Sequence, residues 1–387
     1  MKRTTRNIIL ALILSFSVCA HKCNPQENQT LRSSGNTSPT TLENGPLFLI
    51  DNSSSMPTSE SRQQEKTPPQ QKPKPTPPSK PSGPEIPRPP IQDSMVGYIT
   101  NAVVGSQIRI RSDAGFGNNR PDRSEFFYAQ CGCNSATAPG PGSPPGNPPP
   151  PPPQGLVSNL NFQVLSTYGE FAPIRRFSLF AEVPLRWFQV YHFATPPPNF
   201  RDSSGPSDVQ AGFKLAMLAS DSRYLTFQFQ AYFPTGHAFN ALGTNHYSVE
   251  PALLYFQRLN NRLSLEAEFG DWHPIDGSLS PNSQEFAGDV LFYGIGPSYK
   301  AYRSERVTFA PVIEVVGWRV LGGLETNASK LPNNPIVSAT DTNIVNVKVG
   351  ARTTIGANHS FYIGFGQAVT QERWYRHFVR FEYRFAF

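Results

Sequence analysis

Strict alternation of apolar and polar residues is the feature that most constrains how this chain folds. It is clearest in the last eleven residues, HFVRFEYRFAF at 377–387. In an extended segment one face carries the apolar side chains Val379, Phe381, Tyr383, Phe385 and Phe387. The opposite face carries Arg380, Glu382, Arg384 and Ala386. A helix, with its period of about 3.6 residues, cannot sort them in this way, so the pattern predicts a β-strand.

The same two-residue period recurs from about residue 96 to the end of the chain. Turn-forming sequences such as SDSR, LNNR and GANH separate the alternating segments. Together they predict about twelve strands, within a range of about ten to fourteen. The segments are 105–113, 156–171, 177–187, 208–218, 224–233, 246–258, 262–270, 289–301, 306–320, 343–353, 360–370 and 377–387.

Alternation alone does not say which solvent the apolar face meets. In a soluble sandwich that face is the core, whereas in a membrane barrel it meets lipid. The length of the segments favours lipid, because strands in soluble sheets peak near five or six residues. Aromatic residues near strand ends also favour it, since they are typical of an interfacial girdle. They are Trp187, Trp272, Trp318, Trp374, Tyr383 and Phe387.

No helical segment remains to cover a sheet, and closure would remove the edges of so many long strands. We therefore predict an all-β fold: an antiparallel transmembrane β-barrel of about twelve strands. Prolines inside expected strands argue against this prediction, because each removes a ladder hydrogen bond. They are Pro184, Pro251, Pro297 and Pro311.

The amino-terminal region has a different character. MKRTTR followed by NIILALILSF predicts a signal peptide at 1–20, hence export, with cleavage after Ala20; lipidation at Cys19 or Cys23 is the alternative. Residues 21–95 are rich in Pro, Lys and Ser and predict a disordered linker. The barrel is expected at 96–387, with a Pro-rich loop at 136–155.

The remaining composition points to few other functions. The net charge is +6, but no basic patch is clustered, so we expect no nucleic-acid partner. Cys131 and Cys133 are expected either to form a disulfide with each other or to stay free, and two thiolates make a poor metal site. We expect no cofactor and no metal.

Catalytic patterns are weak. Asn245, His246 and Ser248 resemble a hydrolytic trio, but their spacing along one strand does not place them in line. Asp271, His273 and Asp276 could ligate a metal, yet their spacing matches no ligand pattern and a polar loop is the preferred interpretation. The sequence therefore predicts that the chain is not an enzyme.

Taken together, the signal peptide, the amphipathic strands and the terminal aromatic residues resemble those of bacterial outer-membrane β-barrels. The resemblance implies that Tyr383, Phe385 and Phe387 form the signal read by the barrel-assembly machinery. FQFQAYFPTGHA at 227–238 and the hairpin at 250–275 are similar to outer-membrane channels of the phenol meta-cleavage pathway type. The Pro-rich linker and the CGC sequence at 131–133 depart from that pattern.

Charged residues on the polar faces predict a lumen with two walls. If the first strand pairs with the last, six basic residues lie close together: Arg109, Arg111, Lys348, Arg352, Arg380 and Arg384. Three acidic residues lie across the lumen: Glu250, Glu266 and Glu268. Opposed rows of charge would give a narrow, weakly selective pore. The alternative is a barrel filled by internal salt bridges, because about twelve strands enclose only a narrow lumen.

Two functions remain open at this point. One is a passive outer-membrane channel for small solutes, hydrophobic or aromatic ones included. The other is a closed structural barrel whose Pro/Lys-rich periplasmic arm binds the cell wall or a partner protein. The expected partners are outer-membrane lipid, the assembly machinery and, for the second function, peptidoglycan.

Overall fold

A computed structural model describes residues 90–120, 157–193, 202–237, 242–244, 246–275, 287–330 and 336–387. By internal contacts the chain divides into two units, Met1–Pro77 and Pro78–Phe387, and every described residue belongs to the second. The predicted signal peptide at 1–20, the predicted linker as far as residue 89, the predicted loop at 136–155 and both cysteines at 131 and 133 lie outside the described residues.

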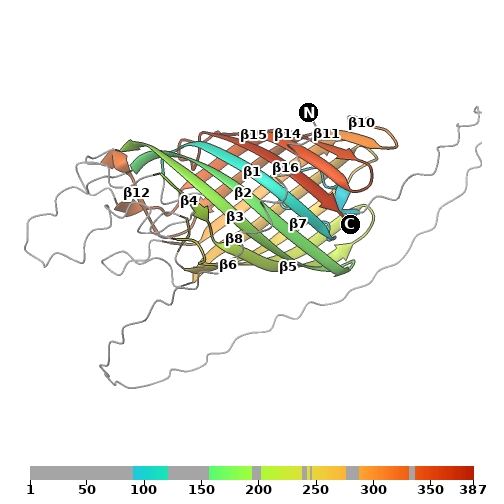
Figure 1. Ribbon diagram of the computed structural model, residues 1–387, viewed down its shortest axis with the longest axis horizontal. Helices are drawn as coiled ribbons and strands as arrows, with labels where there is room; N and C mark the ends of the chain where they lie inside the picture. Colours follow the sequence, from blue (N-terminus) through green and yellow to red (C-terminus); the bar gives the residue numbers. More distant parts are fainter. Residues whose placement is uncertain are drawn as a thin grey trace, which may run out of the picture. The chain divides into compact units, whose positions relative to one another are not determined.

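Long antiparallel strands form one closed barrel (Figure 1). The sheet has 14 strands. Two of them, β4 and β10, are short, and the other 12 form the wall of the barrel. These are β1 (Gln107–Asn118), β2 (Val157–Ile174), β3 (Phe177–Phe193), β5 (Val209–Ala219), β6 (Arg223–Phe233), β7 (Tyr247–Arg258), β8 (Leu263–Ile275), β9 (Val290–Tyr299), β11 (Val307–Val320), β14 (Asn343–Ile355), β15 (His359–Ala368) and β16 (His377–Ala386).

Closure comes from two pairings. Each wall strand pairs with its neighbour along the chain, β9 pairs with β11, and β1 pairs with β16, which lies beside it in Figure 1. The β1–β16 register places Arg109 opposite Arg384 and Asp113 opposite Arg380. The predicted barrel of about twelve strands is therefore confirmed, as is the pairing of its first strand with its last.

Short elements complete the described part of the chain. Strand β4 (Ser203–Pro206) pairs with β3, and β10 (Tyr302–Arg303) pairs with β11. Strands β12 (Leu324–Thr326) and β13 (Ile336–Ser338) form a separate two-stranded sheet. The helices in the described residues are the single 3₁₀ turns η1 (Pro90–Asp93) and η3 (Ala328–Lys330). Among the residues described, no helix has the length and apolarity needed to cross a membrane.

The two faces of the wall have inverted polarity. Large apolar side chains point outward and are about half exposed, among them Ile108, Leu179, Phe269, Ile363 and Phe381. Charged side chains point inward and are buried, among them Lys214, Glu266, Glu314, Lys348 and Arg352. A soluble sheet does the reverse, so this arrangement is that of a membrane β-barrel.

The prediction of an outer aromatic girdle is partly wrong, because three of its tryptophans do not face outward. Trp187 and Phe387 are exposed on the outside as expected, and Tyr383 is half-buried. Trp272, Trp318 and Trp374 are instead buried inside the barrel. In β8, Trp272 shares the face of Glu266 and Glu268, and in β11 Trp318 shares the face of Glu314, so the period-2 rule sends both rings inward.

The four strand prolines lie where the ladders are interrupted or one-sided. The β7–β8 ladder has no paired residue at Pro251, and the β9–β11 ladder has none at Pro297. At Pro184 strand β3 exchanges its partner β5 for β4. Pro311 pairs with β14 and is absent from the β9 ladder. The barrel thus accommodates prolines by omitting pairs that need their missing N–H groups.

The two ends of the barrel differ. At one end short turns join the strands at 175–176, 220–222, 259–262 and 356–358, whereas the connections that leave the strands at the other end, such as the one from Asn118 to Val157, are longer in sequence. The C-terminus lies at the short-turn end, because the backbone N–H of Ala386 donates to the carbonyl of Asn358. Residues Gln92 and Ser106 lie there too: the amide of Gln92 donates to Asn358, and Ser106 accepts from Phe387.

Candidate functional site

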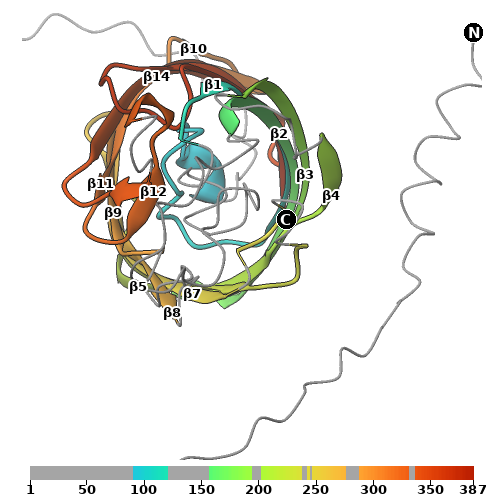
Figure 2. The same ribbon diagram turned by 90° about the vertical axis from the view of Figure 1, so that its left-hand side faces the viewer.

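The lumen contains a segment of the chain itself, residues 90–106, which we call the inner segment. It enters at the short-turn end, runs into the barrel and returns to the same end to begin β1; Figure 2 shows it inside the ring of strands. Residues 90–95, which the sequence assigns to the linker, are part of it. Its apolar side chains are almost completely buried: Ile91, Met95, Val96, Ile99, Ala102, Val103 and Val104.

Three inward-facing glutamates hold the backbone of the inner segment. Glu314 accepts hydrogen bonds from the backbone N–H groups of residues 97, 98 and 99, at 3.2, 2.8 and 2.8 Å. Glu266 accepts from Met95 N at 3.1 Å, and Glu268 accepts from Thr100 N at 2.8 Å. Carboxylates that accept backbone N–H groups form the stronger class of hydrogen bond, so this wall satisfies donors that have no sheet partner.

Basic side chains hold the carbonyl groups of the same segment. Arg352 donates to the carbonyls of Met95 and Val96 at 3.1 and 2.7 Å. Arg380 donates to the carbonyl of Gly97 at 2.7 Å, and Lys214 donates to that of residue 101 at 3.1 Å. The acidic and basic side chains therefore bind opposite groups, the N–H groups and the carbonyls, of the same stretch of backbone.

Acidic residues that the sequence analysis did not single out neutralise the basic wall. Glu382 pairs with Arg352 at 2.8 Å and with Arg384 at 3.3 Å. Glu182 pairs with both Arg109 and Arg111, at 3.1 and 2.8 Å. Asp113 pairs with Arg380 at 2.7 Å. The sequence could have revealed these acids, because Glu182, Glu382 and Asp113 each lie on the polar, inward face of their strand.

Lys348, placed in the basic wall by the sequence, lies among aromatic rings. Its amine is within 5.5 Å of the ring centres of Trp318, Tyr375 and Phe378, at 5.4, 5.4 and 5.2 Å, and it lies against the ring of Tyr98. No ion pair to Lys348 occurs in the described ranges. Cation–π contacts with these rings take the place of a carboxylate partner.

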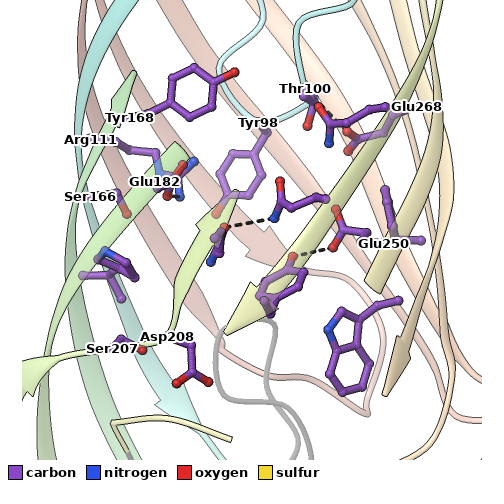
Figure 3. Close-up of a pocket in the computed structure, with 18 of the residues that line it drawn as sticks. Tyr98, Thr100, Arg111, Ser166, Tyr168, Glu182, Ser207, Asp208, Glu250 and Glu268 are labelled. Carbon is purple, nitrogen blue, oxygen red and sulfur yellow. Dashed lines mark hydrogen bonds and ion pairs between the residues drawn. The ribbon is translucent and has the colours of Figure 1, made fainter. Parts of the chain in front are cut away.

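A chamber remains between the inner segment and the long-loop end. Its cavity volume is about 170 Å³. Tyr98 and Thr100 of the inner segment form its floor, and Asp208, Thr244 and Trp272 lie toward the loops. In Figure 3, Arg111 and Glu182 lie on one side of Tyr98, and Glu250 and Glu268 lie on the other. The chamber thus brings together predicted basic and acidic residues that face each other across the lumen.

Described members of the predicted catalytic and metal candidates lie near the long-loop end of the barrel. His246 and Ser248 are buried, and the imidazole of His246 bonds the carbonyl of Thr244 at 2.9 Å. Burial lowers the pKa of His246, although its bond to Thr244 and the charge of Asp208 oppose that shift. Asn245 lies outside the described residues.

His273 bonds Asp289 at 2.7 Å, and these two with Asp271 place three potential ligand atoms within 4.8 Å of one another at the barrel rim. Asp289 therefore stands where the sequence suggested Asp276, which lies outside the described residues. His273 is exposed and Asp289 is half-buried, and no further histidine, cysteine, aspartate or glutamate of the described residues joins the group.

Comparison with known proteins gives structural similarity only. No family model and no curated protein matches the sequence. An outer membrane channel from Pseudomonas putida F1 has a TM-score of 0.46 and 14% identity, covering 76% of this chain and 99% of its own. The NanC porin has a TM-score of 0.38 and 7% identity, covering 72% and 98%.

LpxR from Salmonella typhimurium also has a TM-score of 0.38, with 11% identity over 73% of this chain and 100% of its own. Because these TM-scores are below 0.5, none of the similarities carries an argument about function.

Proposed function

We propose that this protein is an outer-membrane β-barrel that acts as a passive channel for small solutes, with the inner segment as its constriction. The observation that carries the proposal is the chamber of about 170 Å³, enclosed by a wall whose outer face suits lipid and whose inner face is charged. The short-turn end faces the periplasm in this proposal, since periplasmic turns are the short ones in such barrels.

The side chains that line the chamber favour small solutes that have an aromatic or apolar part. Rings from Tyr98, Tyr168, Tyr232, Trp272 and Trp318 stand between the charged and amide side chains. Pockets for drug-sized ligands measure about 300–1,000 Å³, so this chamber suits something smaller. The solute would pass the inner segment only when that segment shifts from its position against Glu314 and Arg352.

Planar-bilayer recording and liposome swelling test the channel. The refolded full chain is expected to give discrete current steps, and liposomes that contain it are expected to swell faster in small solutes than in large ones. Heat-modifiable migration on a gel shows that the barrel is folded in each preparation. Folded protein that gives neither current steps nor swelling would contradict the proposal.

The closed structural barrel is the second candidate, and one observation favours it. The inner segment is held by at least three glutamates and three basic side chains, which is a dense set of bonds for a part that must move. In that case the Pro/Lys-rich arm would bind the cell wall. Sedimentation of the full chain with purified peptidoglycan, in the absence of any current steps, would favour this second function.

A further inference from the structure

Two glutamates on one side of the chamber have no cation partner among the described residues. Glu250, on β7, accepts a hydrogen bond from the Tyr232 hydroxyl, and Glu268, on β8, accepts from Thr100 N at 2.8 Å. No lysine or arginine in the described ranges forms an ion pair with either of them. Both line the cavity, where a carboxylate without a counter-charge is unfavourable.

The arginines across the chamber are already engaged by acids. Arg109 and Arg111 share Glu182, and Arg380 is held by both oxygens of Asp113, at 2.7 and 2.8 Å. The fourth arginine of the lining, at position 186, lies on β3, which β5 and β6 separate from β7. The side of the chamber that still lacks a counter-charge is therefore the acidic one.

Aromatic rings surround that acidic side. Glu250 and Trp272 both line the chamber, and on the adjacent strands β7 and β8 they lie between the paired residues Val249–His273 and Ala252–Gly270. Tyr232 bonds Glu250 directly, and Tyr98 forms the floor. A carboxylate beside several ring faces is the chemistry that recognises an organic cation, since each ring attracts a cation within about 6 Å.

We propose that the chamber binds a small organic cation, of the alkylammonium or trimethylammonium type, with its charge at Glu250 and its methyl or methylene groups against Trp272, Tyr232 and Tyr98. This inference rests on the proposed function, because it names the class of solute that the channel would take. The hydrophobic part of such a solute meets the rings, and its charge supplies the counter-ion that the acidic side lacks.

Isothermal titration calorimetry on the refolded full chain in detergent micelles tests the site. The probes are choline and its neutral isostere 3,3-dimethylbutanol, which has the same shape without the charge. Choline is expected to bind at one site per chain, at least about tenfold tighter than the neutral alcohol. Glu250→Gln is expected to weaken choline binding by about tenfold or more.

Asp221→Asn is the matched control, because it removes the same charge from an exposed turn at the short-turn end, where the side chain is 96% exposed. It is expected to leave choline binding unchanged. Equal affinity for both probes, equal loss in both variants, or no binding by heat-modifiable protein would each overturn the inference.

The binding measurement and the channel measurement separate the two proposals. Current steps without choline binding would leave the channel in place and remove the cation site. Choline binding without current steps would keep the site and contradict the channel. Trp272→Phe provides a second variant, which keeps a smaller ring. It is expected to weaken choline binding while heat-modifiable migration shows that the barrel still folds.

Discussion

At the scale of single residues, the interior of this barrel shows how buried charges are satisfied by backbone groups as well as by opposite charges. Glu314 is fully buried and has no cation partner in the described chain, yet three N–H groups and the Tyr362 hydroxyl donate to it. Hydrogen bonds to a charged group contribute about 1.5–3 kcal/mol each. Glu314 is therefore the residue on which the position of the inner segment depends most.

Glu314→Gln tests this dependence. The amide retains one acceptor oxygen but turns two N–H donors toward the backbone N–H groups, so docking of the inner segment should weaken by about 2–4 kcal/mol. Hydrogen-exchange mass spectrometry should show at least about tenfold faster exchange in residues 95–100 and little change in the wall strands. Asp221→Asn is the control, and unchanged exchange in Glu314→Gln would contradict the assignment.

His246 gives a prediction about pH. Its pKa is lowered by burial in the folded state, so below the unfolded value of about 6.5 the unfolded chain binds more protons. The free energy of unfolding is therefore not reduced by His246 above that pH, and it decreases as the pH falls below it. Between pH 8 and pH 5, the guanidinium midpoint should fall more for the wild type than for His246→Gln. An equal fall in both proteins would show that His246 does not contribute.

At the scale of elements, the sequence predicted the strands well because a two-residue period is a direct consequence of strand geometry. The same two-residue alternation correctly placed Arg109, Glu266 and Arg352 on the inner face. Trp272 was misplaced because its residue type was weighed above its parity. The inner segment could not be predicted, since IQDSMVGYITNAVVGS has no period, and its burial depends on the diameter of a lumen built from distant residues.

Docking of the inner segment requires a residue without a side chain at position 97. A Cβ added to Gly97 would lie 2.2 Å from the Tyr362 ring, whereas one added to Gly169 in β2 meets nothing within 4 Å. Gly97→Ala should therefore displace the inner segment and increase the open probability in planar bilayers several-fold. Gly169→Ala should behave as the wild type. Identical currents from all three proteins would show that the inner segment is not the constriction.

At the scale of the whole molecule, the inverted polarity of the wall fixes the solvent that the barrel can occupy. Many charges on the inward face pair with one another or bind the inner segment, and the pairing of β1 with β16 closes the wall of the barrel. The outward face carries many exposed large apolar side chains. Its solvent can be tested directly by placing one charge at different heights on that face.

Ile363 and Ile174 are both outward and exposed, at 53% and 62%, but at different heights. Ile363 lies mid-strand in β15, opposite Ala351 and Phe381, whereas Ile174 ends β2 at a short turn. In liposomes, Ile363→Arg should lower the unfolding free energy by about 2–4 kcal/mol, and Ile174→Arg by about 0–1 kcal/mol, because the cost of arginine depends on its depth. Guanidinium titration followed by tryptophan fluorescence measures both. If the outer face met water, the two substitutions would have similar and small effects, since exposed surface positions tolerate arginine within about 0.5 kcal/mol.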